Sequence, residues 1–184
     1  MNMLVRPRLV KAAASAALLL AFTSCSSTQG ASEMSRAKLY PSVAALAKDS
    51  ASIVVGRVEE QRVANDVSPD LDFTISRVTV NQVGRSVDGL QPGSKMEVRQ
   101  TGSKAQRAPA QLMEVGASYL LFLTPSGLSG DLASQYYVTG ANAGLYIADA
   151  TAGKMPGPGS KFRQLQRQEG ENLPAQLALS EVTG

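Results

Sequence analysis

Short runs of alternating or wholly apolar residues follow one another along most of the chain, and they predict strands. The runs lie at residues 52–63, 73–83, 95–100, 119–123, 134–139 and 144–149. A period of two residues is typical of strands that bury one face, and the run at 119–123, apolar on both faces, favours a central strand. Because no helical pattern of 10 to 15 residues separates the runs, they predict an antiparallel sheet.

Three features predict where the strands bend or turn. In the run 73–83 the apolar positions are odd, then even, then odd again: Phe73 and Ile75, Val78 and Val80, and Val83. Such a change of phase indicates a bulge or a corner, and bent strands are typical of small closed barrels. Gly56, within the first run, suggests a bulge or a close backbone approach. Residues 140–143 (Gly-Ala-Asn-Ala) offer a place for positive φ and predict a hairpin between the last two strands.

Helical spacing predicts one short helix at each end of the barrel. Residues 40–49 place apolar side chains on one face, with Pro41 at the first helical position. Residues 172–182 begin with Asn172 as a helix cap and carry Pro174 in the first turn. The pattern therefore predicts a mainly β protein, a small antiparallel barrel of about six strands flanked by two helices.

The first 25 residues have a different composition. Three basic residues precede an uncharged apolar run at 12–22, and Thr23 and Ser24 supply small residues before Cys25, the only cysteine. This layout is typical of an export signal, and the apolar run is shorter than the roughly 20 residues of a membrane-spanning helix. The segment resembles the lipobox of bacterial lipoproteins, although Phe22 stands where Leu, Val or Ile is usual. The resemblance implies that Cys25 receives a diacylglyceryl group; the alternative is a secretory leader in which Cys25 is incidental.

These features predict three segments: a signal peptide at 1–24, a flexible tether at 25–38 and a barrel domain at 39–184. The tether is small and polar, a composition that does not order itself. The whole chain has 18 basic and 15 acidic residues, and three of the basic ones lie within 1–24, so the expected mature chain is formally neutral. Neutrality and the absence of Trp disfavour a nucleic-acid partner.

The absence of histidine limits the chemistry that the chain can perform. Histidine is the commonest general base and a common metal ligand, and the sequence has none. A Ser-His triad, a Cys-His pair and a His-ligated zinc site are excluded, and we expect neither a metal nor a cofactor.

Two loops carry polar residues that could form sites. Lys104 and Arg107 can bind an anion or a polar ligand, and the alternative is a solvated basic loop. Asp66, Asp70 and Asp72 lie within seven residues, but their spacing does not match a calcium-binding loop. We therefore expect a solvated acidic turn there.

Four stretches of the barrel region resemble a loosely defined group of bacterial surface proteins. They are Ser-Ile-Val-Val-Gly-Arg-Val (52–58), Phe-Thr-Ile-Ser-Arg-Val-Thr-Val (73–80), Gly-Ala-Ser-Tyr-Leu-Leu-Phe-Leu (116–123) and Gly-Ala-Asn-Ala-Gly-Leu-Tyr (140–146). In layout the region is distantly similar to the OB-like barrel of the tissue inhibitors of metalloproteinases and netrin modules. The resemblance implies an OB-like fold, but no functional residue, because the free N-terminal cysteine and the disulfides of those inhibitors have no counterpart here.

Three functional hypotheses follow. The first is a membrane-anchored, extracytoplasmic lipoprotein without enzymatic activity, which binds an envelope protein or supports an envelope assembly. The second is a protease-inhibitor-like or small-ligand-binding module that uses the loops 102–111 and 126–134. The third is a hydrolase with paired carboxylates or a Ser-Lys pair, which requires Lys104 within hydrogen-bonding reach of a serine.

Overall fold

The computed structural model describes residues 38–106, 108–149, 155–157 and 159–182, all within a compact unit that spans Ser32–Gly184. This part of the chain is mainly β. The strands are β1 (Ser52–Ala64), β2 (Phe73–Ser86), β3 (Lys95–Thr101), β4 (Ser118–Pro125), β5 (Tyr136–Val138), β6 (Leu145–Ala148), β7 (Lys161–Gln164) and β8 (Gln176–Ala178). The helices are α1 (Val43–Lys48) and the 3₁₀ turns η1 (Gly130–Ser134) and η2 (Leu179–Glu181). The predicted signal peptide, nearly all of the tether, and Cys25 lie outside the described residues.

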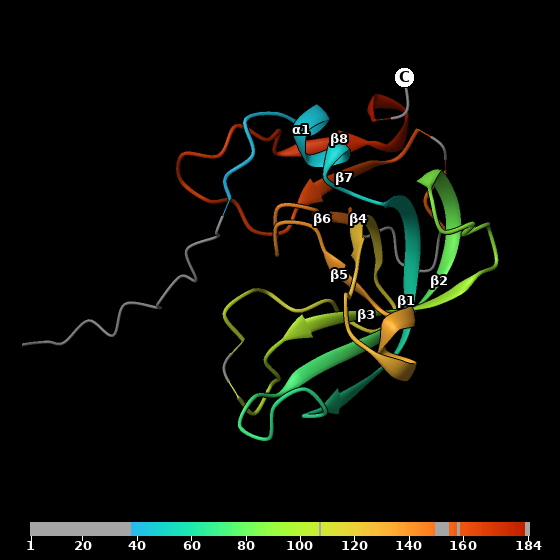
Figure 1. Cartoon of the computed structure of the whole chain (residues 1–184). Coiled ribbons are helices and arrows are strands. Elements are labelled where there is room, and N and C mark those ends of the chain that lie inside the picture. Colours follow the sequence, from blue (N-terminus) through green and yellow to red (C-terminus); the bar gives the residue numbers. More distant parts are fainter. Residues whose placement is uncertain (1–37, 107, 150–154, 158, 183–184) are drawn as a thin grey trace, which may run out of the picture. The chain divides into compact units, whose positions relative to one another are not determined.

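Five strands form a closed barrel (Figure 1). Their order is β1-β2-β3-β5-β4, and pairing of β1 with β4 closes the ring. Strands β6, β7 and β8 continue the sheet from β4. The prediction of an antiparallel barrel needs one correction, because β3 and β5 run parallel and pair only at Val98 with Tyr136 and Arg99 with Tyr137. The six predicted strands are present, but the described chain has eight.

Bulges allow the long β1–β2 ribbon to curve around the barrel, as the changes of phase predict. The register shifts three times, and one shift leaves Asn81 of β2 without a partner between Val80 and Gln82. This extra residue explains why the apolar positions change parity after Val80. A Cβ atom on Gly56 would lie 2.4 Å from the Cγ1 atom of Val78, so the predicted close approach is confirmed.

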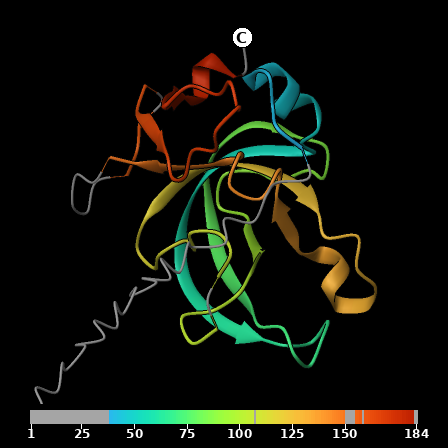
Figure 2. The same ribbon diagram turned by 90° about the vertical axis from the view of Figure 1, so that its left-hand side faces the viewer.

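The barrel strands bury both of their faces, and the protein therefore has two apolar cores. Alternate residues point to opposite sides of a strand, so Leu121 and Leu123 of β4 lie in the barrel interior, whereas Leu120 and Phe122 lie in an outer core. Residues from α1, β7 and β8 cover that outer core, and these elements lie at the same end of the barrel (Figure 2). The prediction that 119–123 forms a central strand is confirmed.

The predictions for the two ends of the domain were partly wrong. The helix at the start begins at Val43, two residues after the expected first position at Pro41, because the Ser42 side chain caps it by accepting the Ala45 N–H at 3.2 Å. The predicted C-terminal helix is absent: residues 176–178 form β8, because pairing with β7 buries Leu177 in the outer core. The Asn172 side chain donates a hydrogen bond to the Pro41 carbonyl oxygen at 3.2 Å instead of capping a helix.

The predicted hairpin at residues 140–143 is also not formed. Strands β5 and β6 pair with successive parts of the same edge of β4, not with each other. The chain leaves that edge after Thr139 and returns at Gly144, so residues 140–143 form a loop that projects from an interrupted strand. The expected positive φ is present, at 63° for Gly140 and 56° for Ala141.

Candidate functional site

The residues predicted to bind a ligand do not form a site in the described chain. Lys104 is exposed, and Arg107 lies outside the described residues. The neighbouring Ser103 is buried, and its hydroxyl donates to the Asp72 carboxylate at 2.7 Å. No hydrogen bond joins Lys104 to a serine anywhere in the part of the chain that the structure describes, so the geometry required of a Ser-Lys hydrolase is not found there.

The predicted acidic turn is structural rather than simply solvated. The Asp72 carboxylate holds Ser103, and the Gln106 side chain binds the same turn by accepting the Asp72 N–H at 2.7 Å and donating to the Asp70 carbonyl oxygen at 3.0 Å. These bonds fold the start of the 102–111 loop onto the β1–β2 loop. Within the described residues, no group of three or more acidic or cysteine side chains could hold a metal ion.

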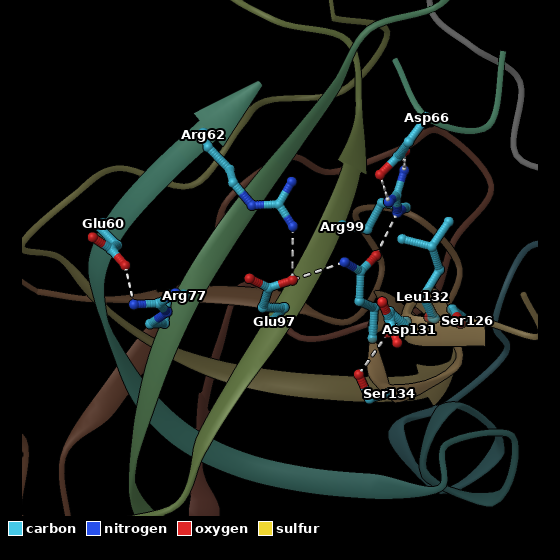
Figure 3. Close-up of polar contacts among 11 residues, drawn as sticks. Glu60, Arg62, Asp66, Arg77, Glu97, Arg99, Ser126, Asp131, Leu132 and Ser134 are labelled. Atoms are coloured by element: carbon cyan, nitrogen blue, oxygen red, sulfur yellow. Dashed lines mark hydrogen bonds and ion pairs between the residues drawn. The ribbon is translucent and has the colours of Figure 1, made fainter. Parts of the chain in front are cut away.

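The most unusual polar group is Arg99, whose side chain is completely buried on the outer face of β3 (Figure 3). Its two terminal nitrogens donate to the Asp66 carboxylate at 2.7 and 3.0 Å, and its Nε donates to Gln135 Oε1 at 2.8 Å. The guanidinium carbon lies 4.8 Å from the centre of the Phe73 ring. A two-bond guanidinium–carboxylate pair with a further acceptor and an aromatic face fixes the side chain tightly.

The network continues from Gln135 toward solvent. The Gln135 Nε2 donates to Glu97 at 2.7 Å, and Arg62 donates to the same Glu97 oxygen at 2.9 Å. Arg77 forms an adjacent ion pair with Glu60. We call Arg62, Asp66, Glu97, Arg99 and Gln135 the Arg99 cluster. The guanidinium of Arg99 holds the pKa of the Asp66 carboxyl below its usual value, so this carboxylate stays charged at neutral pH.

The cluster joins three parts of the chain that are far apart in sequence. Asp66 belongs to the loop that follows β1, Gln135 immediately precedes β5, and Arg99 lies between them on β3. The alternation of β3 sends Met96 and Val98 into the barrel and leaves the side chains at 97 and 99 outside. This alternation was visible in the sequence, but the partners of Arg99 were not.

Two polar hollows lie beside the cluster, and both are lined by Arg77 and Glu97. One has a volume of about 220 Å³ and extends over Leu90 and Tyr136, and the other has about 130 Å³ and extends over Arg62. Half of the Arg62 side chain and half of the Arg77 side chain remain exposed. A ligand could therefore reach both positive and negative groups that are already held in place.

The fold and this face together define a small closed β-barrel with a second, external core and a rigid polar surface. No family model matches the chain, and no curated protein matches it either. Within the described residues, no helix has both the length and the apolar character needed to cross a membrane.

Proposed function

We propose that this protein is a non-catalytic binding module that is anchored to a membrane, on its extracytoplasmic side, by lipid on Cys25. Its recognition surface is the outer face of β2 and β3. The observation that carries the proposal is the Arg99 cluster, because a buried arginine holds two loops against an exposed polar face. A surface that is rigid before binding loses less conformational entropy when a partner arrives.

The order of the strands supports an OB-like barrel. In barrels of that type, the face of the second and third strands and the loops between strands 1 and 2 and between strands 4 and 5 commonly bind ligands. Here these elements are β2, β3, the loop at 65–72 and the loop at 126–135. Arg99 binds a residue from each of the two loops, which supports the choice of this face over the 102–111 loop.

The charges on the face indicate what kind of partner suits it. Arg77 of β2 and Glu97 of β3 pair with Glu60 and Arg62 of the adjacent β1, so the face and its edge carry two positive and two negative groups. A nucleic acid requires an excess of positive charge. A folded envelope protein with charges of both signs matches this pattern better.

The recognition surface can be tested by cross-linking the intact protein in its native envelope and recovering the partner. Arg77→Glu should reduce recovery of that partner at least fivefold, because it reverses a half-exposed charge between the two hollows. Arg163→Glu is the matched control, since Arg163 is an exposed arginine on β7, outside the barrel. Equal recovery with both variants would refute the assignment of the face.

The anchor is tested separately. Cys25→Ser should abolish incorporation of a labelled fatty acid and release the protein from the membrane fraction. If the variant is still labelled, or remains membrane-bound to the same extent, Cys25 is not the anchor. Both experiments use the full chain, so a failure of one leaves the other interpretable.

A further inference from the structure

Strand β1 loses one of its two neighbours halfway along its length. It pairs with β2 from Ser52 to Ala64, but with β4 only from Ser52 to Arg57. The last backbone bonds on the β4 side join Val58 to the turn at residues 116–117. Residues 59–64 therefore form an outer edge of the sheet, which we call the β1 edge. Figure 3 shows this segment with Glu60 and Arg62 on it and β2 beside it.

The bonds of β2 fix the direction of the backbone groups on both of its sides. In an antiparallel ladder, successive residues direct their N–H and C=O groups alternately to the two neighbouring strands. The Asp72 carbonyl oxygen accepts the Gly102 N–H at 2.7 Å, and the Val80 N–H donates to the Ser94 carbonyl oxygen at 2.8 Å. Both bonds lie on the β3 side. Between residues 72 and 80, even-numbered residues of β2 therefore face β3, and odd-numbered residues face β1.

This alternation leaves the backbone groups of Gln61 and Val63 on the free side of β1. The residues of β1 that lie opposite the odd-numbered residues of β2 are Glu60, Arg62 and Ala64. Gln61 and Val63 lie between them, so their N–H and C=O groups point away from β2. Among the described residues, no backbone hydrogen bond reaches those groups. An edge with unpaired backbone groups is a template for another strand.

The side chains at the β1 edge combine charges of both signs with an exposed apolar residue. The Glu60 and Arg62 side chains are 59% and 50% exposed, and Val63 is 58% exposed. Charges of one sign along an edge keep other strands away. Opposite charges two positions apart do not, because an antiparallel partner with the same sequence can place each charge opposite its counterpart.

Only a few registers are open to two copies that pair through this edge. Gln61 and Val63 carry the outward backbone groups, so odd-numbered residues must lie opposite odd-numbered residues. A two-fold axis at Glu60 or Arg62 places like charges opposite each other, which is unfavourable. An axis at Gln61 places Arg62 of each copy opposite Glu60 of the other. An axis at Val63 leaves Arg62 opposite Ala64 and pairs only residues 62–64.

We propose that a second copy of this chain pairs with the β1 edge in the antiparallel direction, about a two-fold axis at Gln61. The backbone groups of Gln61 and Val63 then gain partners, and two Arg62–Glu60 pairs form between the copies. Strands β1, β2 and β3 of the two copies join into one sheet, with the polar faces on the same side. This inference goes beyond the proposed function, because it assigns a self-association surface to a different part of the barrel.

Sedimentation equilibrium of the full-length chain in density-matched detergent micelles measures the association. Six residues on each strand bury less than the roughly 1,200 Å² of a stable interface, so we expect a weak dimer with a Kd on the order of 100 μM. A wild-type chain that stays monomeric up to about 1 mM would overturn the proposal, since that limit lies tenfold above the expected Kd.

The decisive variant is Val63→Pro, with Val63→Thr as its matched control. Proline removes an N–H that makes no bond to β2, so the fold should survive, but the dimer should weaken at least about tenfold. Threonine keeps the N–H and the branched shape, and its Kd should stay within about threefold of the wild type. Arg62→Glu covers the case in which the proline variant does not fold: it creates like-charge pairs and should weaken the dimer about fivefold. An unchanged Kd in Val63→Pro or in Arg62→Glu would refute the edge.

Disulfide cross-linking tests the register. Opposite residues that are not hydrogen-bonded to each other have the closest side chains, so Arg62 and Glu60 of the two copies should come within disulfide range. In a Cys25→Ser background, a mixture of Glu60→Cys and Arg62→Cys chains should cross-link under mild oxidation. A mixture of Arg163→Cys and Arg62→Cys chains should not. Faster cross-linking of Arg62→Cys chains alone than of the first mixture would overturn the axis at Gln61.

The outcomes separate this inference from the proposed function. Dimerisation is measured on the purified chain, without an envelope partner. If the wild type is monomeric while partner recovery still depends on Arg77, only this inference is wrong. If the wild type is monomeric and Val63→Pro reduces recovery of the partner, the β1 edge binds a strand of that partner, and the assignment of a second copy is refuted.

Discussion

Removal of Asp66 should destabilise this protein more than removal of Arg99, although the two side chains form one ion pair. The reason is the difference in burial, since the Arg99 side chain is fully buried and the Asp66 side chain is 32% exposed. In Asp66→Ala the guanidinium remains in the interior without a counter-charge. Breaking a buried ion pair in this way costs about 3 to 5 kcal/mol.

Arg99→Met should destabilise the folded state less than Asp66→Ala does. The methionine fills much of the same volume, and the carboxylate of Asp66 can regain water because it is already partly exposed. The main loss is at Gln135, which is 3% exposed and whose Oε1 loses its donor. An unsatisfied buried acceptor costs about 1 to 3 kcal/mol. We therefore expect the Asp66 variant to be less stable than the Arg99 variant by about 2 kcal/mol.

Urea unfolding at pH 7, followed by far-ultraviolet circular dichroism, measures the free energy of unfolding of each variant. Glu60→Gln is the control, because its ion pair with Arg77 is more than half exposed on the Glu60 side and should change stability by less than about 1 kcal/mol. The double variant Asp66→Ala with Arg99→Met should lose less than the sum of the single losses. Equal losses in the two single variants, or a larger loss for Arg99→Met, would refute the reasoning from burial.

Three further predictions concern stability. Gly56→Ala should lower the free energy of unfolding in urea by about 1 to 3 kcal/mol, because its Cβ would overlap Val78 Cγ1. Adding Val78→Ala should recover part of that loss, and additive losses in the double variant would contradict the overlap. Burial raises the pKa of Tyr119 to about 12. The contribution of Tyr119 to the free energy of unfolding is therefore complete below pH 10 and falls by about 3 kcal/mol as the pH rises to 12. The stability of Tyr119→Phe, measured by urea unfolding over this pH range, should lack this loss. The lowered pKa of Asp66 stabilises the protein above about pH 4, and this contribution is lost as the pH falls through the pKa of the folded state. The free energy of unfolding of Arg99→Met should therefore fall less steeply with decreasing pH than that of the wild type. Identical pH dependences below pH 4 would show that the Arg99–Asp66 pair is not the source of the acid sensitivity.

The strands could be predicted because their signals are local. A run such as 119–123 is apolar on both faces, and that pattern is sufficient to place it between two cores. Gly56 interrupts a β-branched run, and few structural reasons other than a bulge or a close contact explain a glycine there. The four long strands, β1 to β4, and the bend in β2 are therefore consequences of features within about ten residues.

The cluster could not be predicted, because its partners meet only after the barrel has closed. Asp66 and Arg99 are separated by 33 positions, and Gln135 is 36 positions beyond Arg99. An aspartate in a loop rich in turn-forming residues gives no sign that it will pair with a buried arginine. Strands β7 and β8 were missed for a related reason: unlike the equally short β5 and β6, they do not lie within a longer apolar run, and only pairing with their neighbours defines them.

Arg99 also explains how a weak part of the barrel can remain closed. The pairing of β3 with β5 involves two residues on each strand, fewer than in any other pair of strands in the described barrel. Arg99 lies at this point, and its side chain adds three hydrogen bonds that join β3 to residues before β5 and after β1. The same residue also lines a small hollow between β3 and β5. A single buried side chain therefore supports both the closure of the barrel and the polar face, so a change at Arg99 should disturb both, whereas a change at Arg77 should affect only the polar face.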